Sequence, residues 1–166
     1  MRLKSGEVVR NRSRSHLHGD VARFLSEALS KIESKGEKFL VESVDLGRIV
    51  GESICVPTEP GDEIVYAQRL GRSRLTRFVK NKRPQSCSSV TVILLAVENN
   101  QYLLITAFVG SKAAPEPWDK NVEEHSLEFW NSHAIVYGME PIIPGTETTQ
   151  CPWTREEMPK DELVKT

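Results

Sequence analysis

A helix is the first element that the pattern of apolar positions predicts. From Asp20 onward, apolar residues recur at the spacing of one helix face, and charged residues lie elsewhere on the wheel. The apolar positions are Val21, Phe24, Leu25, Ala28, Leu29 and Ile32. Asp20 suits the N-cap, and Gly36 suits the end, because glycine enters the left-handed turn after a helix without steric cost. We therefore expect an amphipathic helix over residues 20–35.

Short apolar and β-branched runs, separated by turns that contain glycine and proline, follow this helix. This rhythm is typical of short antiparallel strands. The expected strands are residues 39–44, 54–57, 63–69, 75–80, 90–97, 102–108 and 133–137. The run at 90–97 is the most apolar, and Asn99 and Asn100 turn it back into 102–108. We expect this hairpin at the centre of the sheet, and a short helix at 126–131 capped by Ser126.

Both ends of the chain are polar. Residues 1–18 mix arginine and lysine with serine and asparagine and have no apolar period, which is typical of a flexible basic arm or a solvated terminus. Residues 139–166 contain four prolines and several threonines, which favour an irregular tail. Residues 19–138 are enough for one core. We expect a single α+β domain, in which an N-terminal amphipathic helix precedes a twisted antiparallel sheet.

Composition narrows the class of protein. Hydrophobic residues make up 39% of the chain and charged residues 27%, which excludes a wholly disordered chain. The longest apolar run ends at Glu98 and is far shorter than the roughly 20 residues that span a bilayer. Residues 1–18 lack the apolar run of a secretory signal, so we expect a cytoplasmic protein with no membrane partner. Cys55, Cys87 and Cys151 are widely spaced, which favours free thiols over disulfides or a zinc site.

The net charge is only −1, but the positive charges are unevenly distributed along the chain. Seven cations and no acidic residue occur within residues 69–83, namely Arg69, Arg72, Arg74, Arg77, Lys80, Lys82 and Arg83. Such side chains bind phosphate oxygens through charge-assisted hydrogen bonds, so RNA or a nucleotide is the expected ligand. The alternative is a solvated edge hairpin, whose cations discourage pairing with other chains.

Two polar residues in the expected strands are candidates for chemistry. If strand 133–137 lies beside the central hairpin, His133 meets Thr106. Histidine is the side chain that titrates near neutral pH without perturbation. Alternatively, His133 is a packed core residue and Thr106 an ordinary strand former. The His16-x-His18 pair has a metal-like spacing but no further ligands, so we predict no metal site and no cofactor.

Several segments together resemble a known family. They are Ile64-Val65-Tyr66-Ala67 leading into Arg69 and Arg72, Thr76 to Lys80, Leu104 to Phe108 with Gly110, Pro115-x-Pro117, and Phe129-Trp130-x-x-His133-Ala134. Over roughly residues 40–138 the chain resembles the barnase, EndoU, colicin and RelE-like nuclease superfamily, particularly its toxin-associated and phage-associated branches. The resemblance implies an RNase-toxin-like fold, a hydrolase that cleaves RNA without a metal, and an antitoxin or immunity protein as partner.

Metal-independent RNA cleavage by attack of the 2′-OH needs a base, an acid and cations that stabilise the transition state. We assign His133 as acid or base, Arg72 and Lys80 as clamps, and Trp118 as a base-stacking platform. Thr106 and Ser126 are candidate positioners of phosphate or hydroxyl groups. The other RNA contacts are assigned to Arg69, Arg74, Arg77, Lys82 and Arg83. The alternative function is a non-catalytic module that binds nucleic acid or an acidic protein through the 69–83 hairpin.

Overall fold

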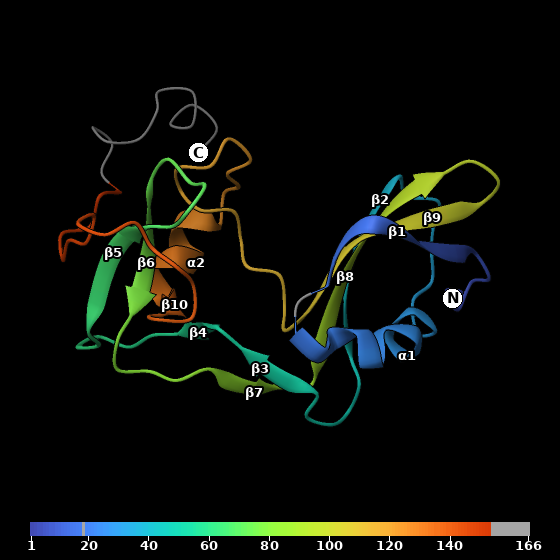
Figure 1. Cartoon of the computed structure of the whole chain (residues 1–166), viewed down its shortest axis with the longest axis horizontal. Helices are drawn as coiled ribbons and strands as arrows, with labels where there is room; N and C mark the ends of the chain where they lie inside the picture. The colour runs from blue at the N-terminus through green and yellow to red at the C-terminus, as the bar shows by residue number, and fades with distance from the viewer. Residues whose placement is uncertain (18, 154–166) are drawn as a thin grey trace. The chain divides into compact units, whose positions relative to one another are not determined.

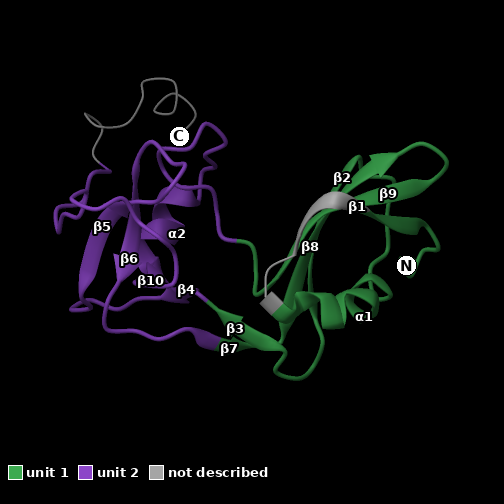
Figure 2. Cartoon of the chain, in the orientation of Figure 1, with its two compact units in different colours: residues 1–53, 86–112 green, residues 54–85, 113–166 purple. Residues whose placement is uncertain are grey.

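The chain divides into two compact units (Figures 1 and 2). The computed structural model describes residues 1–17 and 19–153, apart from the side chains of residues 12–17. Unit 1 consists of residues 1–53 and 86–112, and unit 2 of residues 54–85 and 113 onward. The expectation of one domain over residues 19–138 stays a prediction. Each compact unit is built from two segments that are distant in the chain.

Unit 1 contains a sheet of four strands. Their order is β1 (Val8–Leu17), β9 (Gln101–Val109), β8 (Ser89–Val97) and β2 (Phe39–Asp45). The predicted hairpin is confirmed as β8 and β9, and it occupies the centre of this sheet. Asn99 and Asn100 have φ values of 65° and 56°. Val97 is opposite Gln101, so three residues connect the strands, and these two lie in the left-handed region, which asparagine tolerates.

Strand β1 corrects the expectation of a flexible arm at residues 1–18. It runs parallel to β9, with Val9 opposite Tyr102 and Arg10 opposite Leu103. Val9 is buried in the core together with Leu3. The alternation of this strand is easily missed, because Arg10, one of the basic residues that suggested a solvated arm, is exposed directly beside buried Val9.

Part of the range predicted for the N-terminal helix is helical, but this segment is short and follows β1, whereas the prediction placed it before the sheet. A 3-10 segment η1 (Gly19–Phe24) leads into α1 (Leu25–Leu29). The apolar face is as expected, because Val21, Leu25, Ala28 and Leu29 are all buried. Leu29 accepts a bond from the amide of Ile32, three residues on, so the chain turns and the helix does not reach residue 35.

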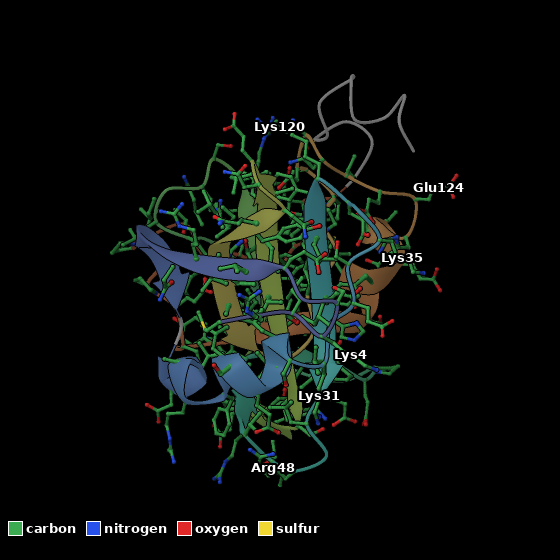
Figure 3. All side chains as sticks on the ribbon, turned by 90° about the vertical axis from the view of Figure 1, so that its right-hand side faces the viewer. Lys4, Lys31, Lys35, Arg48, Lys120 and Glu124 are labelled. Atoms are coloured by element: carbon green, nitrogen blue, oxygen red, sulfur yellow. The ribbon has the colours of Figure 1, made fainter. Side chains whose placement is uncertain are left out.

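The cap predicted for this helix is also different. Asp20 lies inside η1 and Phe24 is the N-cap of α1, where no side chain caps the helix. A surface ion pair holds the segment instead, because Arg48 donates to both carboxylate oxygens of Glu27 at 2.8 and 2.7 Å. Arg48 and Lys31 are labelled beside this segment in Figure 3. Such an exposed pair contributes about 1 kcal/mol or less.

Unit 2 contains a second sheet of four strands. Their order is β4 (Cys55–Pro57), β10 (His133–Val136), β6 (Leu75–Val79) and β5 (Ile64–Gln68). β10 is antiparallel to β4 but parallel to β6. Both sheets are therefore mixed, which corrects the expectation of one antiparallel sheet. A further pair of short strands, β3 (Gly51–Ser53) and β7 (Gln85–Cys87), was not predicted.

Helix α2 (Ser126–Ser132) precedes β10, as the sequence predicts. Its N-cap is His125 and not Ser126, which lies within the helix. Trp130 of this helix is buried in a cluster with Phe78 and Ile135 of the sheet. No helix among the described residues is long and apolar enough to cross a membrane.

The expected irregular tail at residues 139–166 is only partly correct. Residues 139–153 form no regular strand or helix, but they pack on unit 2. The amide of Thr148 donates to the carbonyl of Tyr66 at 2.8 Å, and Trp153 lies edge-on to the Tyr66 ring at 5.3 Å between centroids. Trp153 is only 9% exposed, so this segment contributes to the core. Residues 154–166 lie outside the described part of the chain.

Candidate nucleic-acid interface

The β5–β6 hairpin of unit 2 carries most of the predicted cations. The two strands are antiparallel, with Tyr66 opposite Arg77 and Ala67 opposite Thr76. Side chains alternate between the faces of a strand, so Arg77 and Thr76 point to opposite sides of this sheet. Residues 69–74 form the connecting loop, and residues 80–84 follow β6. The cations therefore gather near both ends of one strand.

Arg69 is a buried structural residue. Its guanidinium contacts a carboxylate oxygen of Glu116 at 2.7 Å and one of Glu140 at 3.1 Å, and it donates to the hydroxyl of Thr76 at 3.1 Å. The Arg69 side chain is 15% exposed and that of Glu116 is 6% exposed. These contacts satisfy the charge of Arg69 inside the unit. Its predicted role as an RNA contact is therefore not supported by its geometry.

Burial raises the pKa of Glu116 above its ordinary value, although the nearby Arg69 opposes this shift. Its oxygen Oε1 is buried without a hydrogen-bond partner among the described residues. A carboxylate with an unsatisfied buried oxygen is costly to ionise, which explains the direction of the shift. Cys55 lies in the same environment, and burial raises the pKa of its thiol to about 12. Cys55 is therefore a thiol at neutral pH and no nucleophile.

Two further cations of the hairpin also have partners inside the unit. Arg77 donates from Nη1 to the hydroxyl of Thr58 and to the carbonyl of His133, both at 2.9 Å. Lys82 lies 3.8 Å from a carboxylate oxygen of Asp62. The amide of Glu59 and the side chain of Asn81 lower the pKa of Asp62, and Lys82 adds to this shift. Arg77 and Lys82 thus have internal roles that account for their charge.

The remaining four cations are exposed. They are Arg72, Arg74, Lys80 and Arg83. The backbone of Arg72 is fixed, because its carbonyl accepts from Gln68 Nε2 at 2.6 Å and its amide donates to Arg69 at 3.2 Å. Lys80 lies over the ring of Tyr137, with Nζ 4.9 Å from the ring centroid. These side chains can contact an anionic ligand without leaving a buried charge behind.

Trp118 is held next to the loop end of this hairpin. Its Nε1 donates to the carbonyl of Leu75, the first residue of β6, at 3.1 Å. The preceding loop is fixed by the buried Glu116 and by Ala114, whose carbonyl accepts from Trp130 Nε1 at 2.8 Å. The indole is half-buried, so part of it remains accessible. The role of Trp118 as a stacking platform stays a prediction.

His133 is held in a fixed orientation at the junction of α2 and β10. Its ring stacks on Phe129, with centroids 4.1 Å apart and an angle of 1° between planes. Nδ1 lies 3.0 Å from the carbonyl of Phe129 and 3.0 Å from the hydroxyl of Ser132. A carbonyl can only accept, so Nδ1 carries the hydrogen and the lone pair of the neutral ring is on Nε2.

The other predicted catalytic residues do not gather around His133. Ser126 is fully buried, and its hydroxyl accepts from the amide of Glu123 at 2.9 Å, so it cannot position a substrate. Thr106 lies on β9 opposite Ile93, in unit 1. The expected meeting of His133 and Thr106 in one sheet is wrong, because β10 pairs with β4 and β6 and not with the central hairpin.

Sequence reasoning missed Glu116, Glu140 and Thr58, which pair with the arginines of the hairpin. The one weak signal in the sequence was the position of Glu116 between two prolines, because a charged residue in such a rigid loop is unusual. Among residues 1–17 and 19–153, no group of three or more His, Cys, Asp or Glu side chains is arranged to hold a metal ion. His18 and the side chain of His16 lie outside the described residues, so the prediction for this pair stays a prediction.

Comparison of the chain with family models, curated proteins and solved structures finds no match. The resemblance to the nuclease superfamily therefore depends only on the residues quoted above.

Proposed function

We propose that unit 2 binds single-stranded RNA through the exposed cations of the β5–β6 hairpin together with Trp118. The observation that supports this most is the division among the seven cations. Arg69, Arg77 and Lys82 are partly buried and contact polar groups of the unit, whereas the side chains of Arg72, Arg74, Lys80 and Arg83 are exposed to solvent. An aromatic ring beside exposed cations is the combination that single-stranded nucleic-acid sites use.

The spacing of these groups suits a short stretch of RNA. β6 has five residues and four intervals, so its two ends are separated by about 13 Å at about 3.3 Å per residue. Trp118 and Arg74 lie near one end, and Lys80 lies at the other. Stacked nucleotides rise by about 3.4 Å each, so roughly four nucleotides cover this distance. We expect a footprint of this order and little dependence on base sequence.

Binding is tested with a labelled single-stranded RNA in EDTA by fluorescence anisotropy. Arg72→Ala removes an exposed cation and should weaken binding several-fold at low salt. Trp118→Ala removes the stacking ring and should weaken binding by about 1–3 kcal/mol. Lys35→Ala, an exposed cation of unit 1, is the matched control and should leave affinity unchanged. Equal affinity in all four proteins would exclude the hairpin as the site.

A second candidate function is metal-independent RNA cleavage, and the geometry of His133 favours it. With Nδ1 held by the Phe129 carbonyl, Nε2 can accept the proton of a ribose 2′-OH. The 2′-oxygen then attacks phosphorus, the bond to the 5′-oxygen breaks, the leaving 5′-oxygen takes a proton from water, and a 2′,3′-cyclic phosphate remains. The roles assigned to Arg72 and Lys80 as clamps stay a prediction: Lys80 lies over the ring of Tyr137, four residues beyond His133 along the chain.

Cleavage is tested by incubating the protein with total RNA and a tRNA pool in EDTA and analysing the fragment ends. We expect cyclic phosphate ends from the wild type, and none from His133→Ala despite unchanged binding. Intact RNA in a preparation that still binds RNA would leave the binding module as the function. Fragments that persist in His133→Ala would remove His133 from the mechanism.

We propose the cytoplasm as the place of action. Cys55, Cys87 and Cys151 form no disulfide with one another. Cysteines without disulfides are typical of reducing compartments, where RNA is also available. We also propose an antitoxin or immunity protein as a partner, and this proposal depends only on the resemblance to the nuclease superfamily.

A further inference from the structure

A second partly exposed aromatic ring, that of Tyr137, lies at the end of strand β6 in unit 2. Strand β10 runs parallel to β6, with Val136 opposite Val79. Tyr137 directly follows β10, and its amide donates to the carbonyl of Val79 at 2.9 Å. Trp118 is bonded to the carbonyl of Leu75, at the beginning of β6. The two rings therefore lie near opposite ends of one strand.

Contacts on three sides hold the ring of Tyr137. Its hydroxyl donates to a carboxylate oxygen of Glu147 at 2.5 Å. The ring of Phe78 lies 6.2 Å away between centroids, at an angle of 84°, and because Phe78 is fully buried this contact is on the core side. Lys80 is exposed and its Nζ lies 4.9 Å from the ring centroid. One face of the ring is thus turned towards solvent, under the side chain of Lys80.

A base can replace the Lys80 side chain on this face. A cation–π contact at an exposed site is weak, whereas stacking of a base on an aromatic ring is stronger. The ammonium of lysine sits on a flexible stem, so it can leave the ring at little cost. It is then available to the phosphate that adjoins the stacked base.

The acidic groups near Tyr137 leave this face open to an anionic ligand. Glu147 contacts the hydroxyl at the edge of the ring and does not lie over its face. The same hydrogen bond raises the pKa of Tyr137, so the ring stays uncharged at neutral pH. Asp62 accepts from Asn81 Nδ2 at 2.9 Å and lies 3.8 Å from Lys82 Nζ, so its charge is compensated locally.

We propose that Tyr137 is a second stacking platform for single-stranded RNA, so that one base stacks at each end of β6. This inference rests on the RNA binding proposed for the hairpin. The ends of β6 are about 13 Å apart, and stacked bases rise by about 3.4 Å each. Bases about four positions apart therefore reach Trp118 and Tyr137 together.

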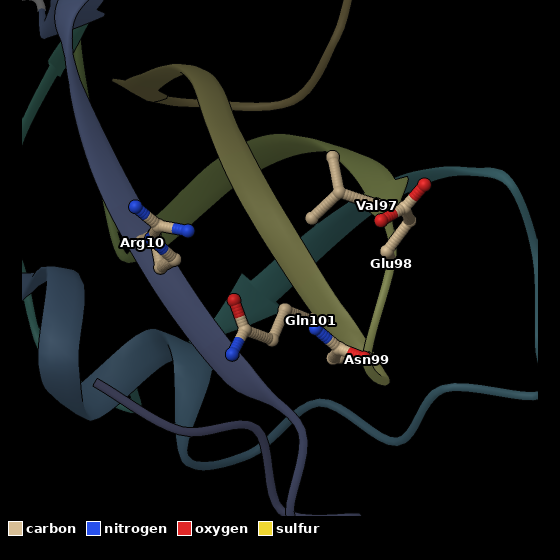
Figure 4. A pocket seen from close by; sticks show the side chains of 5 residues that line it. All are labelled: Arg10, Val97, Glu98, Asn99 and Gln101. Atoms are coloured by element: carbon tan, nitrogen blue, oxygen red, sulfur yellow. The ribbon is translucent and has the colours of Figure 1, made fainter.

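A hollow in unit 1 lacks this combination of groups and supplies a control. It has a volume of about 450 Å³ and is lined by Arg10, Val97, Glu98, Asn99 and Gln101 (Figure 4). None of these five residues is aromatic, and the attraction of phosphate to Arg10 is opposed by Glu98. Arg10 is therefore an exposed cation from which we expect no contribution to RNA binding.

Two substitutions separate the ring of Tyr137 from its hydroxyl. Tyr137→Phe and Tyr137→Leu both remove the bond with Glu147 and both keep an apolar side chain beside Phe78, but only Tyr137→Phe keeps an aromatic ring. Affinity for an eight-nucleotide single-stranded RNA is measured in EDTA by fluorescence anisotropy. Tyr137→Leu should weaken binding about fivefold or more, Tyr137→Phe less than about twofold, and Arg10→Ala should leave it unchanged. Tyr137→Leu should also leave the salt dependence unchanged, because it removes no phosphate contact.

Nuclear magnetic resonance of the tyrosine rings tests the contact directly in the wild type. The chain has three tyrosines, and the spectrum of Tyr137→Phe identifies the signals of Tyr137 by their loss. RNA should shift the ring signals of Tyr137, because a stacked base lies over the ring. The signals of Tyr102, which belongs to unit 1, should not move. This measurement needs no stable Tyr137→Leu protein.

The outcomes separate this inference from the proposed function. Absence of RNA binding by the wild type at low salt would contradict both. RNA binding that Arg72→Ala weakens, with equal affinities of Tyr137→Phe and Tyr137→Leu or with unshifted Tyr137 signals, would overturn the second platform alone.

Discussion

At the scale of single residues, the most consequential feature is that equal formal charges have unequal roles. Arg69 and Arg72 are three positions apart, yet one is buried between two glutamates and the other is exposed. A count of cations along the sequence treats them alike. Only the partners of each side chain separate the arginine that holds the fold together from the arginine that is available to a ligand.

Arg69→Ala should destabilise the protein severely. The substitution leaves the buried carboxylate of Glu116 without its cation, and breaking a buried pair in this way costs about 3–5 kcal/mol. Arg72→Ala is the matched control and should change the free energy of unfolding by less than about 0.5 kcal/mol. Urea unfolding of the two variants measures both values. A loss for Arg69→Ala no larger than that for Arg72→Ala would contradict the buried network.

Glu116 also predicts a dependence of stability on pH. Because burial raises its pKa above 4.5, the folded protein binds this proton more tightly than the unfolded chain does. The contribution of Glu116 to stability therefore falls as the pH rises from 4.5 through the folded-state pKa. The free energy of unfolding of the wild type minus that of Glu116→Gln should fall over this range and then level off. All other groups cancel in this difference, and a difference that rises with pH would refute the assignment.

At the scale of elements, the segment after β10 has no regular structure but still belongs to the core of unit 2. Its hydrogen bonds with Tyr66 and the packing of Trp153 take the place of a strand. Prolines and threonines made this segment appear unable to pack. They exclude regular elements, but they do not prevent one large aromatic ring from being buried.

Trp153→Ala should therefore destabilise unit 2 by about 3 kcal/mol, as is usual when a buried aromatic ring is removed. We expect the lower end of the usual range, because the Nε1 atom of Trp153 is buried without a hydrogen-bond partner among residues 1–17 and 19–153. Met139→Ala, at a residue of the same segment that is 51% exposed, should have a small effect. Thermal or urea unfolding measures both changes. An unchanged midpoint for Trp153→Ala would mean that the segment does not pack in solution.

The elements were more predictable from the sequence than their pairing. Period-two alternation and the Asn99-Asn100 turn act between neighbours in the chain, and the hairpin of β8 and β9 follows from them. The position of β10 depends on contacts with β4 and β6, which are distant in sequence and leave no periodic signal. For the same reason the exposed cations and Trp118 could be proposed from composition, whereas the partners of Arg69 could not.

At the scale of the whole molecule, the candidate site belongs to one of the two units. Unit 2 holds the exposed cations of the hairpin, Trp118, Tyr137 and His133. With a net charge of −1, the chain has no overall attraction for polyanions. Affinity for RNA must therefore come from the local cluster on the hairpin, and it must depend strongly on salt.

The slope of log affinity for single-stranded RNA against log salt concentration tests this account most directly. Each phosphate neutralised on a single strand contributes about −0.7 to the slope, so four exposed cations predict a slope of about −2.8. Arg72→Ala should reduce its magnitude by about 0.7, whereas Lys35→Ala should not change it. No binding by the wild type at low salt, or a slope that Arg72→Ala leaves unchanged, would contradict the assignment of the hairpin as an RNA-binding site.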